Sequence, residues 1–111
     1  MEIRFSSRGL ERTFNDATRM VRAYGKQMAT VIQNRMAVLQ NVVHLGKVPT
    51  EKPIRCHQLK QDRAGQFAVD LVQPYRLIFR PDHNPVPTLK DGGIDLTAVT
   101  AIEIIDVTDY H

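Results

Sequence analysis

Asp109, Tyr110 and His111 combine three side chains that can move or position a proton. They directly follow a strand-like run at 101–107. Imidazole is the side chain best suited to proton transfer near neutral pH. A phenol can donate or accept a hydrogen bond, and a carboxylate can orient an imidazole or stabilise its charged form. The three residues are therefore candidates for acid–base catalysis; the alternative is a polar tail that only solvates the last strand.

Two further places in the sequence carry cations that suit anion recognition. Arg55 and His57 are two residues apart in a strand-like segment, so we expect them on one face, with Lys60 at the strand end. The alternative for this segment is an edge strand with protective charges. Arg76 interrupts the apolar run at 75–80. A guanidinium there either points to solvent or binds an anion, and phosphate suits its planar fork.

The elements that position these residues begin with two amphipathic segments. From 8 to 24, apolar residues recur every three or four positions, which predicts a helix. A looser stripe at 26–44 predicts a second helix, and Gly25 between them predicts a helical hairpin. Five cations lie on the polar side of the first region: Arg8, Arg12, Arg19, Arg22 and Lys26. We call them the basic stripe, which is either a solvated face or a contact for a polyanion.

Short runs with a period of two, typical of strands, recur after residue 53. We expect strands at 54–60, 66–72, 75–80 and 101–107, and residues 2–6 could add a short first strand. Proline and glycine at 81–95 predict a loop, and 96–99 a short helical turn. The expected fold is α+β, with a two-helix N-terminal hairpin packed on one face of a small, mainly antiparallel twisted sheet. With 111 residues we expect one domain, 1–111.

Composition and charge exclude several classes of protein. Hydrophobic residues make up 42% and charged residues 24%, which is typical of a globular domain. No apolar run approaches the roughly 20 residues that cross a bilayer, and the first residues lack a signal-peptide layout. We therefore expect a cytoplasmic protein without membrane contact. Residues 1–80 hold fourteen Lys or Arg against six Asp or Glu, a balance of +8, which favours polyanionic partners.

Cysteine and metal chemistry are not expected. Cys56 is the only cysteine of the sequence and should alternate away from His57, so we interpret it as a packed side chain rather than a nucleophile. The four histidines show no metal-ligand spacing, so we expect no metal site. Three aspartates are interpreted as turn or surface residues: Asp62, Asp70 and Asp106.

Four segments together resemble the HigB-type toxins of bacterial type II toxin–antitoxin systems, in the RelE/ParE superfamily. They are Ile54–Gly65, Gln66–Val69, Tyr75–Phe79 and the closing Asp109-Tyr110-His111. The first contains the motif His-x-Leu-Lys-x-Asp-Arg-x-Gly. The order of helices and strands agrees as well, so the resemblance covers nearly the whole chain and implies a RelE-like fold. Gln61 stands where the motif more often has glycine, and 81–95 is longer and richer in proline than the family's connection.

The resemblance implies an mRNA interferase that enters the A site of a translating ribosome and cuts the message there. The 2′-hydroxyl of the RNA attacks the adjacent phosphate, so no metal or other cofactor is required. His57, Asp109, Tyr110 and His111 match the family's active-site residues. Lys60 and Arg76 match its basic supports, and Arg55 is assigned with them to phosphate or RNA binding. Either histidine could be the acid or the base, and Tyr110 could orient the ribose or stack on a base.

The same resemblance implies partners. These are a helix-turn-helix antitoxin of the HigA type, the ribosome and mRNA, with DNA met only through the antitoxin. The basic stripe would contact ribosomal RNA. Two other functions stay open: a ParE-like toxin that acts on DNA gyrase, and a non-enzymatic RNA-binding regulatory module. A gyrase toxin needs no acid–base residues, so the closing tripeptide argues against it, whereas the basic stripe fits the regulatory module equally well.

Overall fold

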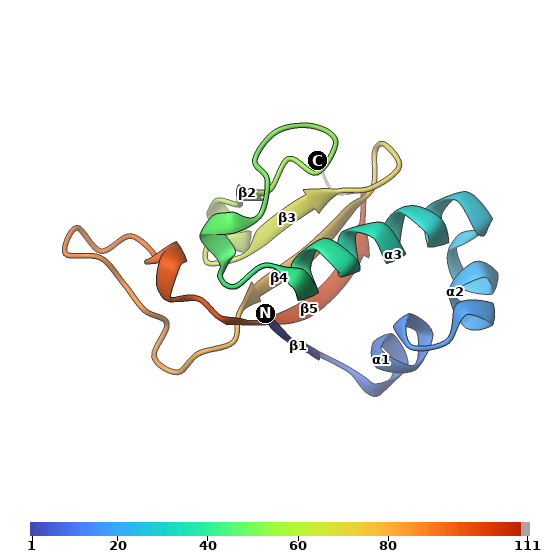
Figure 1. Ribbon diagram of the computed structural model, residues 1–111, viewed down its shortest axis with the longest axis horizontal. Coiled ribbons are helices and arrows are strands. Elements are labelled where there is room, and N and C mark those ends of the chain that lie inside the picture. The colour runs from blue at the N-terminus through green and yellow to red at the C-terminus, as the bar shows by residue number, and fades with distance from the viewer. Residues whose placement is uncertain (110–111) are drawn as a thin grey trace.

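The computed structural model describes residues 1–109, which form a five-stranded sheet with α-helices on one face (Figure 1). The strands are β1 (Glu2–Phe5), β2 (His57–Gln58), β3 (Phe67–Asp70), β4 (Arg76–Pro81) and β5 (Ala101–Thr108). Their order in the sheet is β1-β5-β4-β3-β2. β1 runs parallel to β5, and all other neighbours are antiparallel. The expected α+β fold with a mainly antiparallel sheet is confirmed, and β5 lies inside the sheet.

The first expected helix is two helices. Within residues 1–109 the α-helices are α1 (Arg8–Phe14), α2 (Ala17–Tyr24) and α3 (Lys26–Asn41). The helix is interrupted at Asn15 because Asp16 caps the start of a new helix. The Asp16 carboxylate accepts hydrogen bonds from two backbone N–H groups of α2. The break lets the ring of Phe14 pack edge-on against both Phe5 and Tyr24.

α2 and α3 meet at Gly25, as expected. Its φ of 85° lies in the left-handed region, which glycine adopts without a Cβ clash. α3 then crosses one face of the sheet (Figure 1). Its buried residues Ile32 and Leu39 belong to the main core, together with Leu77 and Phe79 of β4. α3 ends at Asn41, three residues before the expected end at 44.

The other face of the sheet carries different side chains. Val69 and Leu77 belong to the main core with α3, whereas their neighbours Ala68 and Ile78 form a separate small cluster with Leu59. Because successive side chains of a strand point to opposite faces, the second cluster lies on the far side from α3. Among residues 1–109 no α-helix covers that side, which we call the open face (Figure 1).

The expected strand at 54–60 is wrong except at His57 and Gln58. Residues 51–55 form a turn closed by the N–H of Arg55, which donates to the carbonyl of Glu51 at 2.8 Å. The backbone φ of Arg55 is 48°, whereas residues of a β-strand have strongly negative φ values. Gln61 has a φ of 55°, also in the left-handed region. Left-handed backbone explains why glycine suits that position of the motif.

Residues 82–98 form an arm that projects from the sheet (Figure 1). A single bridge joins Thr88 and Ile94, and the N–H of Leu89 donates to the carbonyl of Gly93 at 2.7 Å. The expected helical turn is a 3-10 helix at Leu96–Ala98. In the described part of the chain, no helix has the length and apolar character that a membrane span requires.

Candidate functional site

A row of polar side chains crosses the open face at the end of three strands. Asp70 of β3 pairs with Arg76 of β4, and Arg76 pairs with Thr108 of β5. Directly opposed residues of antiparallel strands share a face. The three alternate with the core residues Val69 and Leu77, so their side chains lie on the open face.

His57 lies on the same face, one row further along the strands. It pairs with Ala68, which pairs with Ile78. Ala68 and Asp70 are two residues apart on β3, so His57 and Asp70 are diagonal neighbours across two strands. The register thus gathers His57, Asp70 and Arg76 on the open face.

Arg55 enters this group from the turn that precedes β2. Its Nε and Nη2 donate to the two carboxylate oxygens of Asp70 at 2.7 and 3.0 Å, a bidentate fork. Arg76 approaches the same carboxylate, with its Nε 3.5 Å from Oδ1, and Gln73 donates to Oδ2 at 3.3 Å. The backbone of Asp70 is held too, because its N–H donates to the carbonyl of Ile54 at 2.8 Å. Two guanidinium groups on one carboxylate leave the cluster with net positive charge.

Asp70 is only 4% exposed, which makes it the one fully buried charged residue within 1–109. Burial alone would raise the pKa of its carboxyl group, because the charged form loses hydration. The hydrogen bonds from Arg55 and the charges of Arg55, Arg76 and His57 outweigh burial and lower this pKa below its ordinary value. Asp70 is therefore a carboxylate at neutral pH, and it orients its cations. Its interpretation as a turn or surface residue is wrong.

His57 has one ring nitrogen engaged. Nδ1 lies 2.8 Å from the backbone carbonyl oxygen of Arg55. A carbonyl oxygen only accepts, so the neutral ring carries its proton on Nδ1 and keeps Nε2 as its basic atom. His57 is half-buried. The ring can therefore accept a proton at Nε2 without giving up the hydrogen bond that orients it.

The other expected site residues are only partly brought together. Lys60 is exposed, two residues beyond β2, at the start of the 3-10 helix Gln61–Arg63. Asp109 is exposed and directly follows Thr108, the residue that pairs with Arg76. Tyr110 and His111 lie outside the described residues.

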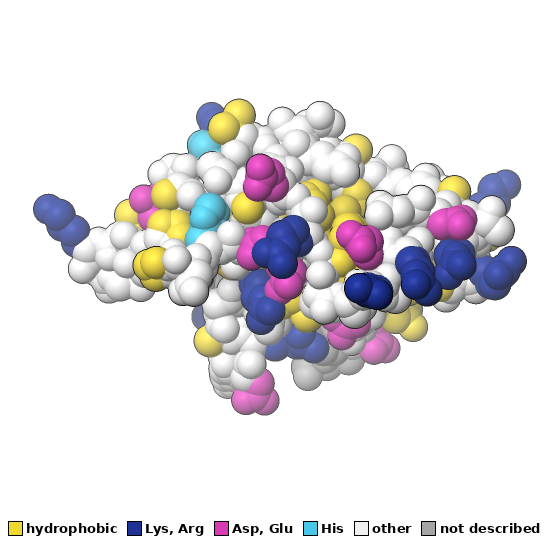
Figure 2. Space-filling view, turned by 90° about the horizontal axis from the view of Figure 1, so that it is seen from below, with side chains coloured by type: hydrophobic (Ala, Val, Ile, Leu, Met, Phe, Trp, Pro, Cys, Tyr) yellow, Lys and Arg dark blue, Asp and Glu magenta, His cyan; other side chains and the backbone are white. Residues whose placement is uncertain are grey.

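The basic stripe is exposed but does not lie along one helix. Figure 2 shows Lys and Arg side chains gathered over the end of the molecule that contains α1 and α2. Because the helix is interrupted at Asn15, the stripe is divided between α1, α2 and the first residue of α3. The expectation that it lies on a single helical face is therefore wrong. Arg19 also lies 3.6 Å from the Asp16 carboxylate. The five side chains are Arg8, Arg12, Arg19, Arg22 and Lys26, all exposed.

Cys56 is packed against the main core, as expected from alternation with His57. Burial raises the pKa of its thiol to about 11. The thiol is therefore protonated at neutral pH and is a poor nucleophile.

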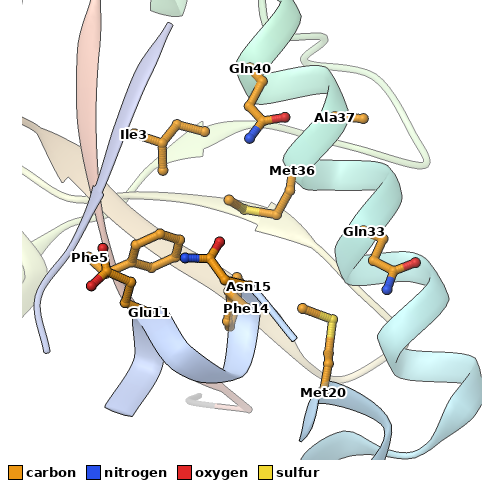
Figure 3. A pocket seen from close by; sticks show the side chains of 10 residues that line it. All are labelled: Ile3, Phe5, Glu11, Phe14, Asn15, Met20, Gln33, Met36, Ala37 and Gln40. Carbon is orange, nitrogen blue, oxygen red and sulfur yellow. The ribbon is translucent and has the colours of Figure 1, made fainter. Parts of the chain in front are cut away.

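A separate hollow of about 380 Å³ lies between β1, α1 and α3 (Figure 3). Its lining includes the apolar side chains of Ile3, Phe5 and Met36, together with the Glu11 carboxylate and side-chain amides such as that of Gln40. The cations of the open face do not line it. It lacks the paired acid–base groups that a reaction on a phosphate needs.

Sequence reasoning missed Asp70 and Arg35 as parts of the site. An acid that interrupts the apolar run 67–72, six residues before Arg76, was the available signal for Asp70. Arg35 stands on the apolar stripe of α3, where a cation is out of place, and its Nε donates to the Asp70 backbone carbonyl at 2.7 Å. Among residues 1–109, no three His, Cys, Asp or Glu side chains group closely enough to hold a metal ion.

No family model and no curated protein sequence match this chain. Its structure is similar to that of the YoeB/ParE toxin from Agrobacterium tumefaciens, with a TM-score of 0.58 and 13% sequence identity. The similarity covers 100% of both chains. At this identity the comparison establishes the fold. The described part of the chain therefore has the RelE-like fold of this YoeB/ParE toxin.

Proposed function

We propose that this protein is the toxin of a type II toxin–antitoxin pair and that its domain, 1–111, cleaves mRNA on the ribosome. The observation that carries this proposal is the open-face cluster, in which Asp70 fixes Arg55 and Arg76 beside His57. Oriented guanidinium groups next to a proton carrier suit phosphodiester cleavage, where negative charge builds on phosphorus and on the leaving oxygen. The fold shared with a YoeB/ParE toxin is consistent with this role.

The proposed reaction is an attack of the RNA 2′-hydroxyl on the adjacent phosphorus. One imidazole, of His57 or His111, takes the proton of the 2′-hydroxyl while the oxygen–phosphorus bond forms. The bond to the 5′-oxygen of the next nucleotide breaks, and a protonated group gives that oxygen a proton. The cations of Arg55, Arg76 and Lys60 would stabilise the negative charge that develops on the phosphate oxygens as the new bond forms. The chemistry uses only proton transfer and charge stabilisation, so no metal or cofactor takes part in the proposal.

The residues at the end of the chain complete the proposed site. β5 lies inside the sheet, and its last residue, Thr108, pairs with Arg76. Asp109 therefore follows directly after a residue that neighbours the cation cluster. Asp109, Tyr110 and His111 keep the catalytic roles that the HigB resemblance implies. The proposed partners are a helix-turn-helix antitoxin of the HigA type, the ribosome with its mRNA, and DNA only through the antitoxin. The basic stripe is proposed to contact ribosomal RNA.

Incubation of the protein with translating ribosomes, followed by mapping of the message ends, tests this function. We expect new 5′ ends within the A-site codon that appear only when translating ribosomes are present. A parallel supercoiling assay tests inhibition of DNA gyrase. Gyrase inhibition without cleavage would favour the ParE-like alternative, and ribosome binding without either effect would favour the RNA-binding module.

A further inference from the structure

A pocket of about 560 Å³ lies where α3, the turn at 51–55 and the end of β3 meet. Its wall contains Arg35, Lys52 and Arg55 against one carboxylate, that of Asp70. Arg55 and Gln73 both donate hydrogen bonds to this carboxylate, so its acceptor capacity is largely used. The pocket therefore presents excess positive charge in a concave, half-enclosed place, which favours an anion.

Two of the three cations, Arg35 and Lys52, form no salt bridge among residues 1–109, and the Asp70 carboxylate acts on Arg35 only from beyond ion-pair distance. Arg35 donates to the backbone carbonyl oxygens of Asp70 at 2.7 Å and of Pro53 at 3.4 Å, both neutral acceptors. Lys52 is exposed. Across the described residues, neither side chain forms an ion pair with an acidic group. The Arg35 guanidinium is thus held at the pocket by two backbone carbonyls, whereas the exposed Lys52 ammonium can turn toward a bound anion.

Arg55 connects this pocket to the open face. It lines the pocket and at the same time forms the fork with Asp70, the carboxylate that Arg76 also contacts. Its φ of 48° lies in the left-handed region, which non-glycine residues seldom adopt. A continuous track of cations therefore runs from Arg76 on the open face, over Arg55, to Arg35 and Lys52.

We propose that this pocket binds a backbone phosphate of the RNA strand next to the phosphate that is cleaved. The inference rests on the proposed function, because it takes the strand to lie across the open face. A single strand presents phosphates at regular intervals, and a groove of cations is the usual means by which proteins follow such a backbone. Arg35 supplies a fixed, planar donor group, and Lys52 supplies a flexible point charge.

The test uses a single-stranded oligonucleotide of about eight nucleotides with 2′-O-methyl groups. It cannot be cleaved by 2′-hydroxyl attack, so the assay measures binding alone. Affinity is measured over a range of salt concentrations for the parent, for Lys52→Gln and for Lys90→Gln, a matched loss of one exposed lysine on the distant arm. Lys52→Gln should reduce the slope of log affinity against log salt by about 0.7, the contribution of one phosphate contact to a single strand. Lys90→Gln should leave the slope unchanged.

Arg35→Gln provides a second variant, which should also reduce the slope, with the melting temperature recorded because Arg35 holds two backbone carbonyls. An unchanged slope in both pocket variants, or an equal reduction in Lys90→Gln, overturns the proposal. Adenosine 5′-monophosphate that binds the parent as tightly as the oligonucleotide, and loses affinity in Lys52→Gln, would assign the pocket to a free nucleotide instead. A reduced slope in a protein that cleaves no message would retain the pocket and remove the proposed enzymatic function.

Discussion

Arg55 and Asp70 are joined by two hydrogen bonds of 2.7 and 3.0 Å across fifteen residues of sequence. The carboxylate is buried, and Arg55 reaches it from a left-handed backbone conformation. The same carboxylate lies 3.5 Å from Arg76. Asp70 is thus the residue that sets the positions of both guanidinium groups on the open face.

Replacement Asp70→Asn is expected to lower the free energy of unfolding by about 2–3 kcal/mol. The change leaves two partly buried cations without their carboxylate, and removal of one partner of a buried ion pair is costly. Chemical unfolding in urea measures the difference. Asp62→Asn removes an exposed acid in the neighbouring turn and should change stability by less than about 0.5 kcal/mol. Equal stability of the two variants would show that the Asp70 cluster contributes nothing to folding.

Stability should also depend on Asp70 in acid. Because the folded state lowers the pKa of this carboxyl group, its contribution is complete above the unfolded pKa of about 4. It is lost as the pH falls below that value and through the folded pKa. The stability gap between the parent and Asp70→Asn should therefore be largest at neutral pH and shrink toward pH ~3. A gap that stays constant over this range would contradict a depressed pKa.

The Cys56 thiol is expected to react slowly with alkylating reagents in the native protein. With a pKa of about 11, only about one thiol in a thousand is ionised at pH 8. Iodoacetamide labelling followed by mass spectrometry measures the rate, with the urea-unfolded protein as the control that reacts fast. Cys56→Ser should retain message cleavage, because the side chain packs against the core rather than in the proposed reaction. Loss of cleavage in a well-folded Cys56→Ser variant would give this thiol a role that we exclude.

Each imidazole of the proposed acid–base pair should be needed for cleavage. His57→Ala and His111→Ala are expected to reduce the rate by about 10²- to 10⁴-fold, the usual contribution of one general acid or base. Primer extension on message from cells that express each variant provides the measurement. His83→Gln is the control, since glutamine can still accept the hydrogen bond that His83 Nε2 takes from the Thr100 N–H. Full cleavage by the His111→Ala variant would show that the closing tripeptide is only a polar tail.

The basic stripe should contribute to ribosome binding and not to folding. Arg12→Glu combined with Arg22→Glu is expected to weaken ribosome association on the order of tenfold at low salt, with a smaller effect at high salt. Lys47→Glu combined with Lys90→Glu reverses the same number of charges elsewhere on the surface. Sedimentation with ribosomes measures the binding, and melting temperatures should agree among all three proteins. Equal ribosome affinity in both double variants would identify the stripe as an ordinary solvated face.

Local signals in the sequence were enough for most of the elements. The period of the apolar residues located the helical region 8–24, α3, β3, β4 and β5, and Gly25 marked the turn between the last two helices. These features depend on neighbours a few positions away. The interruption at Asn15 also had a local signal, because Asp16 is a good N-cap residue. The apolar stripe continues across this position, however, and it favoured a single helix.

The site itself required the tertiary structure. Sequence alone marked Arg55, His57 and Arg76 as unusual, since their residue types suit phosphate chemistry. Only the register of β2, β3 and β4 placed His57, Asp70 and Arg76 on one face, and only the turn before β2 brought Arg55 to the Asp70 carboxylate.

The proximity of Arg35 and Lys52 could not be found from local sequence. They lie seventeen positions apart, on a helix and in a turn, and they share a pocket only because α3 packs beside the end of β3. The periodicity of apolar residues indicates which face of a helix or strand is buried. The distance between charges on different elements depends on how those elements pack, and no short stretch of sequence contains that information.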